Sequence, residues 1–252
     1  MNYFGYQQII ITMINKYKNI LVLIVLLMGT FLVLKDNQRS KDIVYSIQTD
    51  KKVVALTFDD GPHPIYTGQL LDILNKYNVK ATFFMIGASV KKYPFIVKDI
   101  IAKGHAIGNH TYTHPNMATC SRTEIIRELN ECQLIIRQVI GRPVFIFRPP
   151  RGLFNKDVIR IAQKSGYQTI LWSICGNNRN AKNPESMARR VIKNIHPGDI
   201  ILLHDGTFDS RWKDIDATRL IIESLLKKGF RFVTIPQLLK LSDESFFNTK
   251  YK

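Results

Sequence analysis

Cysteine is scarce in this sequence. The 252-residue chain has three, Cys120, Cys132 and Cys175, and no two of them have C-x-x-C spacing. An odd, widely spaced set gives no basis for a disulfide-stapled fold or for a cysteine-ligated zinc site. A single bridge is compatible with the count, but we predict free, mostly buried thiols.

Acidic residues are also few. The chain has 20 Asp and Glu against 36 Lys and Arg, a formal net charge of +16 at pH 7. This balance favours association with anionic material such as nucleic acid, phospholipid head groups or phosphate-bearing wall polymers. The basic residues are scattered, without a basic arm, finger spacing or an aromatic-basic motif, so we expect no nucleic-acid partner. We expect a solvated basic surface close to a membrane or an acidic wall.

One hydrophobic run stands out near the N-terminus. The apolar segment Ile20–Leu34 follows Lys16 and Lys18, and no small-x-small cleavage pattern comes after it. We therefore predict that residues 1–35 form an uncleaved signal-anchor that spans the membrane. The alternative is a cleaved signal peptide, which would give a secreted protein.

The remaining chain divides into a polar linker at 36–50, a folded domain at 51–241 and a tail at 242–252 without recognisable chemistry. In the domain, short apolar runs alternate with longer amphipathic stretches. The predicted strands are residues 53–58, 81–86, 105–109, 144–148, 168–173, 199–204 and 230–235. The predicted helices include residues 68–78, 122–141 and 216–229.

This alternation predicts an α/β fold with a parallel sheet and right-handed crossovers. Gly104, Gly166 and Gly229 each stand just before a predicted strand, where glycine commonly ends a helix. Seven strand–helix units within a single domain suit a barrel, complete or incomplete, better than an open sheet.

Polar side chains follow several of the predicted strands. Because the sites of parallel barrels form at the C-terminal ends of the strands, we expect these side chains to share one pocket. They are Asp59, Asp60, His110, His114, Arg148, His204 and Asp205.

Two pairs among them indicate a metal site. His110 and His114 have the i, i+4 spacing that puts two imidazoles on one face of a helix. Asp59 and Asp60 stand at a strand end, where adjacent side chains point to opposite faces and can take separate tasks. Each pair alone also fits a structural role, as core histidines or as an Asx-turn. Together, one Asp and two His form a three-ligand set that leaves positions open for water and substrate.

Four segments in order, "TFDDGPH", "HTYTH", "RPPRG" and "LLHD", resemble the motifs of the polysaccharide deacetylase family, the NodB homology domain of carbohydrate esterase family 4. The similarity runs from about Val53 to Leu239. It implies a distorted (β/α)7 barrel and metal-dependent removal of N-acetyl groups from amino-sugar polymers.

The resemblance also implies a role for each matching residue. Asp60, His110 and His114 would bind a divalent metal, usually Zn2+, with Co2+ as an alternative. Asp59 would be the general base, and Arg148 would hold Asp59 ionised through a charge-assisted contact.

Four further residues complete the expected site. The backbone N–H of Arg151 would stabilise the oxyanion, and His204 would protonate the departing amine. Leu202 and Trp172 would line the pocket for the acetyl methyl group.

The sequence departs from the family pattern twice. Arg151 occupies a position that normally carries an aromatic residue. After Trp172, where many relatives have an Asp pair that tunes the acid histidine, this chain has Cys175, Asn177 and Asn178. An amide does not stabilise imidazolium as a carboxylate does, so we predict an activity optimum shifted toward acid pH.

The resemblance favours a monomeric, membrane-anchored deacetylase with an extracytoplasmic catalytic domain, acting on an N-acetylated glycan that is most simply peptidoglycan. A second hypothesis is an O-acetyl esterase of xylan-like chains, or a deacetylase of chitooligosaccharides or exopolysaccharide. A third is a glycan-binding barrel without turnover, which the altered region after Trp172 suggests.

Overall fold

The computed structural model describes residues 16–17, 42–176, 183–206 and 211–241. The chain divides into two units, residues 1–42 and residues 43–252, and nearly all described residues belong to the second. The hydrophobic run predicted to span the membrane lies outside the described residues. Within the described part of the chain, no helix is both long and apolar enough to cross a bilayer.

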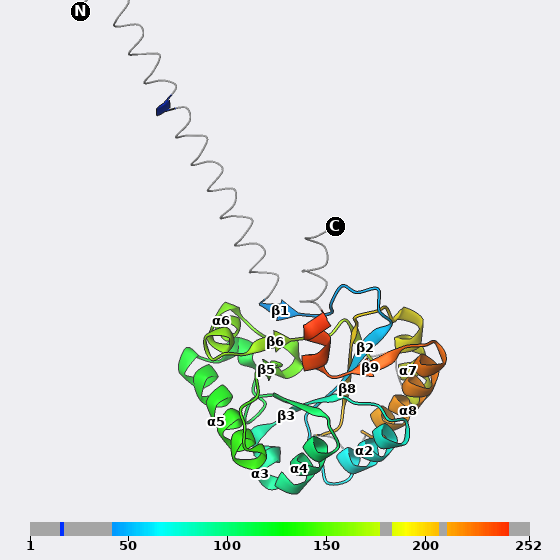
Figure 1. The fold of residues 1–252 in the computed structure, drawn as a ribbon. Coiled ribbons are helices and arrows are strands. Elements are labelled where there is room, and N and C mark those ends of the chain that lie inside the picture. Colours follow the sequence, from blue (N-terminus) through cyan, green and yellow to red (C-terminus); the bar gives the residue numbers. More distant parts are fainter. Residues whose placement is uncertain (1–15, 18–41, 177–182, 207–210, 242–252) are drawn as a thin grey trace, which may run out of the picture. The chain divides into compact units, whose positions relative to one another are not determined.

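A curled sheet forms the centre of the second unit (Figure 1), and all pairings between its strands are parallel. The strand order is β1-β6-β5-β4-β3-β2-β8-β7, and β9 pairs with β2. The strands are β1 (Ile43–Val44), β2 (Val53–Asp59), β3 (Thr82–Met85), β4 (Ala106–Asn109), β5 (Ile146–Phe147), β6 (Gln168–Ile170), β7 (Ile174–Cys175), β8 (Ile200–His204) and β9 (Arg231–Val233).

The predicted parallel α/β architecture is confirmed, in the form of a half-barrel. All seven predicted strands are present. The predicted strand at 168–173 ends earlier, at Ile170, and a further strand that was not predicted, β7, begins at Ile174. β6 pairs with β5, whereas β7 pairs with β8. Residues 168–175 therefore contribute one strand near each end of the curled sheet. A complete ring of seven β/α units remains a prediction.

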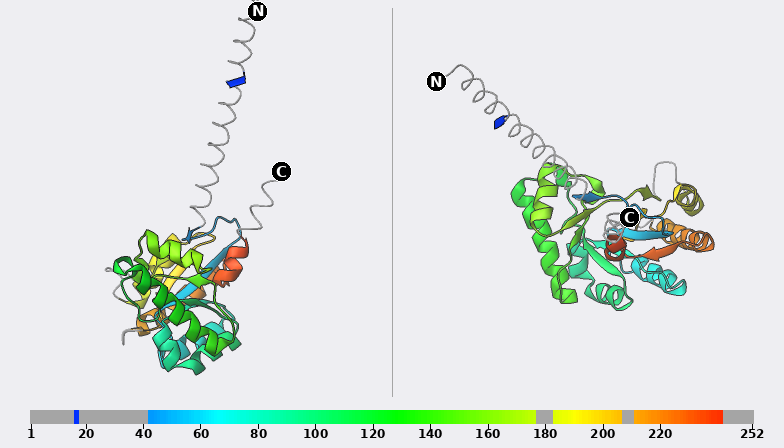
Figure 2. Two further views of the ribbon diagram at one scale, coloured as in Figure 1. Left: turned by 90° about the vertical axis from the view of Figure 1, so that its left-hand side faces the viewer. Right: turned by 45° about the horizontal axis from the view of Figure 1, so that its top comes forward.

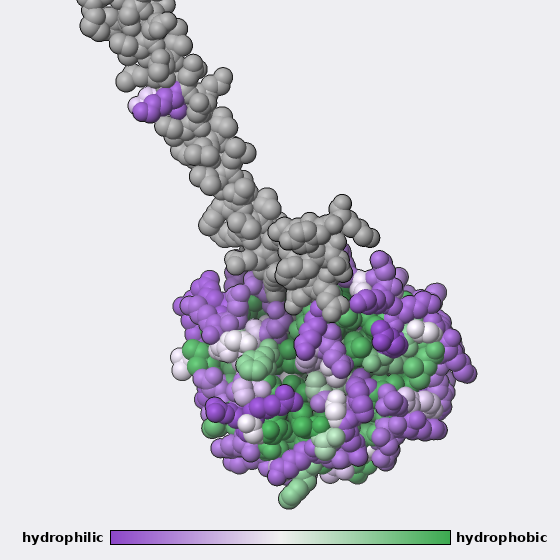
Figure 3. All heavy atoms as spheres, in the orientation of Figure 1, coloured by the Kyte–Doolittle hydropathy of each residue, from purple (hydrophilic) through white to green (hydrophobic). Residues whose placement is uncertain are grey.

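Helices surround the sheet on its convex side (Figures 1 and 2). They are α2 (Tyr66–Lys76), α3 (Gly87–Lys92), α4 (Pro94–Ala102), α5 (Arg122–Ile140), α6 (Lys156–Lys164), α7 (Pro184–Asn194) and α8 (Trp212–Lys227). The glycines predicted to end helices, Gly104, Gly166 and Gly229, all have positive φ, as that role requires. Hydrophilic side chains cover much of the periphery of the face shown in Figure 3, as expected of amphipathic helices.

Strand β2 shows how the sheet separates two hydrophobic cores. Leu56 and Phe58 join the core between sheet and helices, whereas Val53 and Ala55 join a smaller core on the concave side. Because side chains alternate along a strand, the concave face of β2 ends on Asp59. The sequence thus places a carboxylate at the C-terminal end of the concave face.

Residues 43–47 fall within the segment predicted as linker, but they join the sheet. β1 pairs with β6, and the N–H of Ile47 donates to the carbonyl of Gly198 at 3.0 Å. The side chain of Ile47 is buried in the concave core. A short apolar stretch in a polar segment is too brief to predict as a strand, and its partners lie more than 100 residues away.

Candidate active site

The two aspartates after β2 point into the same site, which corrects the expectation that they face opposite sides. Asp59 ends the concave face of the strand, and Asp60 has φ of 77°, a left-handed conformation. This backbone turn brings the second carboxylate back beside the first. Both are buried, with 3% and 6% of their surfaces exposed.

The two histidines do not lie on a helix, so the helical explanation of their spacing is wrong. His110 follows β4, and the segment from 110 to 114 is a loop in which Thr111 and His114 have φ of 68° and 62°. The loop nevertheless brings the two imidazoles together, with ring centroids 5.1 Å apart. The prediction that the two imidazoles lie together is therefore confirmed, although the helical reason given for it was wrong.

Buried polar residues hold this loop in its shape. Glu128 of α5 accepts hydrogen bonds from the backbone N–H groups of Tyr112 and Thr113, at 2.9 and 2.8 Å, and from the Thr113 hydroxyl at 2.7 Å. Asn109 Oδ1 accepts from the N–H of Thr111 at 2.8 Å. Glu128 was not predicted to belong to the site, because an acidic residue within an amphipathic helix ordinarily faces solvent.

Asp60, His110 and His114 converge on one point. The Nε2 atoms of His110 and His114 lie 3.5 and 3.2 Å from Asp60 Oδ1. One ligand atom from each residue lies within 4.8 Å of the other two. On the far side of its ring, His110 Nδ1 lies 2.7 Å from the carbonyl oxygen of Arg148, which directs Nε2 toward the carboxylates.

The electrostatics of this cluster suit a cation. Burial alone would raise the pKa of Asp60, but hydrogen bonds with His110 and His114 hold it far below its ordinary value. Burial alone would lower the pKa of His110, but Asp59 and Asp60 raise it. One carboxylate and two imidazoles, with a second-sphere contact at His110, form the donor set of a divalent metal site with open positions.

Arg148 and Asp59 form a buried ion pair beside the cluster, as the resemblance implied. Arg148 Nη1 donates to Asp59 Oδ1 at 2.7 Å and to Thr57 Oγ1 at 2.9 Å. Its other guanidinium nitrogens donate to the carbonyls of Ile170 and Leu171. Burial lowers the pKa of Arg148, and the Asp59 carboxylate opposes that shift.

His204 ends β8 at the level of Asp59, its register partner on β2. Leu202, two residues earlier, is buried with 3% of its surface exposed. Asp205 is fully buried, and its Oδ2 accepts a hydrogen bond from the hydroxyl of Thr67 at 2.6 Å. Burial raises the pKa of Asp205 to about 7.

Arg151 precedes Gly152, the residue that the Trp172 indole contacts. Arg151 is exposed and has φ of 58° in the turn η2 (Pro150–Gly152). The indole of Trp172 lies so close to Gly152 that an added Cβ would be 2.8 Å from Cη2. The Arg148 guanidinium lies 5.6 Å from the indole centroid, so Trp172 joins this turn to the buried ion pair.

Two residues near the start of α8 belong to the site but were not predicted. Arg211 Nη2 donates to Asp60 Oδ2 at 2.9 Å. Asp214 Oδ1 accepts from the backbone N–H of His204 at 3.1 Å and lies 3.6 Å from His204 Nδ1. The expectation that no carboxylate faces the His204 ring is therefore wrong, and the reason for predicting an acid-shifted activity optimum no longer holds.

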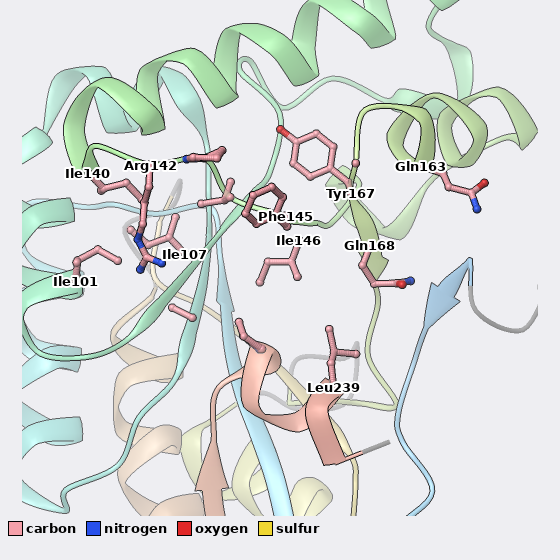
Figure 4. A pocket seen from close by; sticks show the side chains of 15 residues that line it. Ile101, Ile107, Ile140, Arg142, Phe145, Ile146, Gln163, Tyr167, Gln168 and Leu239 are labelled. Carbon is pink, nitrogen blue, oxygen red and sulfur yellow. The ribbon is translucent and has the colours of Figure 1, made fainter. Parts of the chain in front are cut away.

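A hollow of about 640 Å³ lies at the other end of the strands (Figure 4). Its lining includes Ile101, Ile107, Phe145 and Leu239, and Arg142 is the charged residue among the described groups around it. Its walls come from the beginnings of β4, β5 and β6, whereas the cluster lies after the ends of strands. The hollow is therefore separate from the candidate site.

Comparisons with known proteins agree with this geometry. The sequence matches the Polysaccharide deacetylase family over residues 46–170. A peptidoglycan-N-acetylglucosamine deacetylase of Bacillus cereus is 40% identical over 200 residues, which cover 79% of this chain and 93% of that protein.

Two solved structures are similar throughout the described domain. A peptidoglycan N-acetylglucosamine deacetylase in complex with 4-naphthalen-1-yl-N-oxidanyl-benzamide superposes with a TM-score of 0.76 at 34% identity, covering 79% of this chain and 94% of that one. A CE4 family pseudoenzyme from Bacillus anthracis superposes with a TM-score of 0.72 at 34% identity, covering 78% of this chain and 68% of that one.

Proposed function

We propose, because the chain belongs to the polysaccharide deacetylase family, that it hydrolyses N-acetyl groups of an amino-sugar polymer, most specifically the N-acetylglucosamine of peptidoglycan. One observation carries the proposal: the cluster of Asp60, His110 and His114 lies beside a buried carboxyl group, Asp59, that a buried arginine holds in place. This arrangement joins a metal site to a general base.

The reaction divides among the residues of this chain. A divalent cation, when bound, supplies Lewis acidity that polarises the acetyl carbonyl and acidifies water. Asp59 takes a proton from the attacking water, while Arg148 keeps Asp59 ionised and oriented. His204 gives a proton to the nitrogen as the C–N bond breaks, so that acetate and a free amine are the products.

The remaining residues are proposed to bind the substrate and to stabilise the oxyanion. The N–H of Arg151 faces the developing oxyanion, and Leu202 and Trp172 line the pocket for the acetyl methyl group. The guanidinium of Arg151 at the rim favours an anionic glycan. Two imidazoles and one carboxylate favour Zn2+ as the ion, with Co2+ as a substitute.

We propose that residues 1–35 anchor the protein in the membrane with the catalytic domain outside the cytoplasm, as a monomer close to its wall substrate. The net charge of +16 would favour approach to anionic wall polymers. The secreted form, after signal cleavage, is the alternative.

Two other functions are distinguishable by experiment. An O-acetyl esterase would use the same metal and base but release a hydroxyl group in place of an amine. A glycan-binding barrel without turnover is the other, and one of the similar solved structures is a CE4 family pseudoenzyme from Bacillus anthracis. The intact set of Asp59, Asp60 and both metal-binding histidines favours an enzyme.

The test is product analysis with residues 36–252, reconstituted with Zn2+ or Co2+, on N-acetylated peptidoglycan, chitooligosaccharides and O-acetylated xylan. We expect free amine and acetate from peptidoglycan, and no turnover by Asp59→Asn although that variant still binds metal. Turnover of acetylated xylan alone would favour the esterase. Glycan binding without any hydrolysis would refute the proposal.

A further inference from the structure

We propose that Asp214 is the positioning residue for His204, holding its imidazole ready to protonate the departing amine. This inference deepens the proposed function and rests on it. The carboxylate that faces His204 then comes from helix α8. From the sequence, it was expected in the segment after Trp172.

One oxygen of Asp214 contacts two groups of His204. Asp214 Oδ1 accepts the backbone N–H at 3.1 Å and lies 3.6 Å from the ring nitrogen Nδ1. The Asp214 side chain is 3% exposed, so water screens the contact little. Since Nδ1 faces the carboxylate, Nε2 on the other edge of the ring is the nitrogen that we assign to the substrate side.

The second oxygen of Asp214 is oriented by Arg211. Arg211 Nη1 lies 3.7 Å from Asp214 Oδ2, and its Nη2 donates to Asp60 Oδ2 at 2.9 Å. Arg211 Nε also donates to the carbonyl of Gly206 at 2.8 Å, which fixes the guanidinium. A chain of charged contacts thus joins the metal-site carboxylate to the acid histidine through Arg211 and Asp214.

Two other places where such a carboxylate could be sought do not supply it. Residues 171–182, where relatives carry an Asp pair, contain no Asp or Glu. Asp205, next to His204, is engaged by the Thr67 hydroxyl. A carboxylate facing Nδ1 sets the tautomer and stabilises the protonated ring. Around metal-binding histidines, removal of such a carboxylate typically lowers activity 10- to 100-fold, and we expect a loss of about that size for His204.

A structural role is the competing explanation, because Asp214 lies in the first turn of α8, where a carboxylate also stabilises the helix. The two explanations differ in how the loss of activity on substitution of Asp214 depends on the leaving group of the substrate. An amide needs a proton donor, whereas an aryl acetate such as 4-nitrophenyl acetate releases a stable phenolate without one.

The experiment therefore compares both substrates in the metal-loaded protein. For Asp214→Asn we expect kcat on an N-acetylated glycan to fall about 10- to 100-fold with KM unchanged, and the aryl acetate rate to stay at the wild-type level. Asp214→Glu, which keeps the charge, should recover part of the loss. Added to His204→Ala, Asp214→Asn should cause no further loss, because the two residues act as a unit.

Asp216→Asn is the matched control, since it removes the same charge from an exposed position of the same helix. Parallel losses on both substrates, with a lowered Tm, would assign Asp214 a structural role and overturn the inference. Wild-type kcat on glycan in Asp214→Asn would overturn it too while leaving the proposed function intact. Wild-type protein that hydrolyses no acetylated glycan would refute the proposed function itself.

Discussion

Arg148 Nη1 donates a hydrogen bond of 2.7 Å to Asp59 Oδ1, and the side chains of this pair are 0% and 5% exposed. The guanidinium also lies 4.0 Å from the centroid of the Phe84 ring, which belongs to the concave core. A full charge in such a place is tolerated because each guanidinium nitrogen donates to at least one oxygen atom. The base of the proposed reaction is thus built into the core of the sheet.

This pair gives the first prediction. Arg148→Met should lower the free energy of unfolding by about 3–5 kcal/mol, because it leaves the buried Asp59 carboxylate without its partner. It should also lower kcat about 100-fold or more, through loss of the oriented base. Urea unfolding and steady-state kinetics measure the two effects.

The control for this prediction is Arg142→Met, which removes the same charge from an exposed position. A double-mutant cycle adds a second check. In Asp59→Asn/Arg148→Met no unpaired charge remains, so the stability loss should be smaller than the sum of the single losses. Strict additivity would show that the ion pair is not the source of the effect.

The metal cluster gives the second prediction. With Zn2+ at 100 times its Kd, the wild-type protein should gain about 2.7 kcal/mol of stability, seen as a raised Tm. His114→Ala should lose most of that gain, because one of three protein ligands is missing. His196→Ala, whose side chain is 80% exposed, should keep it. Equal Tm shifts in both variants would place the ion elsewhere.

The close contact of Gly152 with Trp172 gives the third prediction. In the Gly152→Ala variant, residue 152 would have φ of 67° and its Cβ would lie 2.8 Å from the indole, so Trp172 must move. We expect kcat/KM on glycan to fall about tenfold or more, because displacement of a substrate-positioning group by even 1 Å is costly. Metal affinity, measured by isothermal titration, should not change.

Gly141→Ala separates this displacement from backbone strain. Gly141 has φ of 76°, and an added Cβ would meet nothing within 4 Å. It should therefore lose about 1 kcal/mol of stability with activity intact. Equal loss of activity in the two alanine variants would show that Trp172 has no part in substrate binding.

Periodicity and composition predicted the strands and the polar residues after them because both follow from local patterns. Strand β2 reads as an apolar run, and its end on Asp59 fixes one part of the site. The convergence of Asp60 with His110 and His114 followed from the rule that parallel strands end at one edge. These expectations needed no knowledge of the loops.

The loops and long-range contacts could not be predicted in the same way. Positive φ at Asp60 and His114 depends on tertiary contacts, among them the hydrogen bonds of Glu128 to the loop before His114. The approach of Asp214 to His204 depends on how α8 packs after β8. In sequence, each of these acids resembles any other charge on an amphipathic helix.

Asp205 gives the last prediction, on stability and pH. Burial, with lesser contributions from Asp60 and Asp59, raises the pKa of Asp205 from 3.8 to about 7. Its Oδ1 is a buried polar atom without a hydrogen-bond partner among the described residues. The folded protein therefore binds more protons than the unfolded chain between about pH 4 and about pH 7, and stability should fall as the pH rises through that window.

Asp205→Asn tests this, because the amide cannot ionise but still offers an oxygen to Thr67. Relative to wild type, the variant should gain stability as the pH rises from 4 to 7, by up to about 4 kcal/mol if the whole shift is expressed. Urea unfolding of both proteins with chelator present measures the difference at each pH, and the exposed Asp216→Asn serves as control. A stability difference between the two proteins that stays constant from pH 4 to 7 would contradict the prediction. It would mean that Asp205 is ionised in the folded protein, because contacts such as the Thr67 hydrogen bond outweigh the effect of burial.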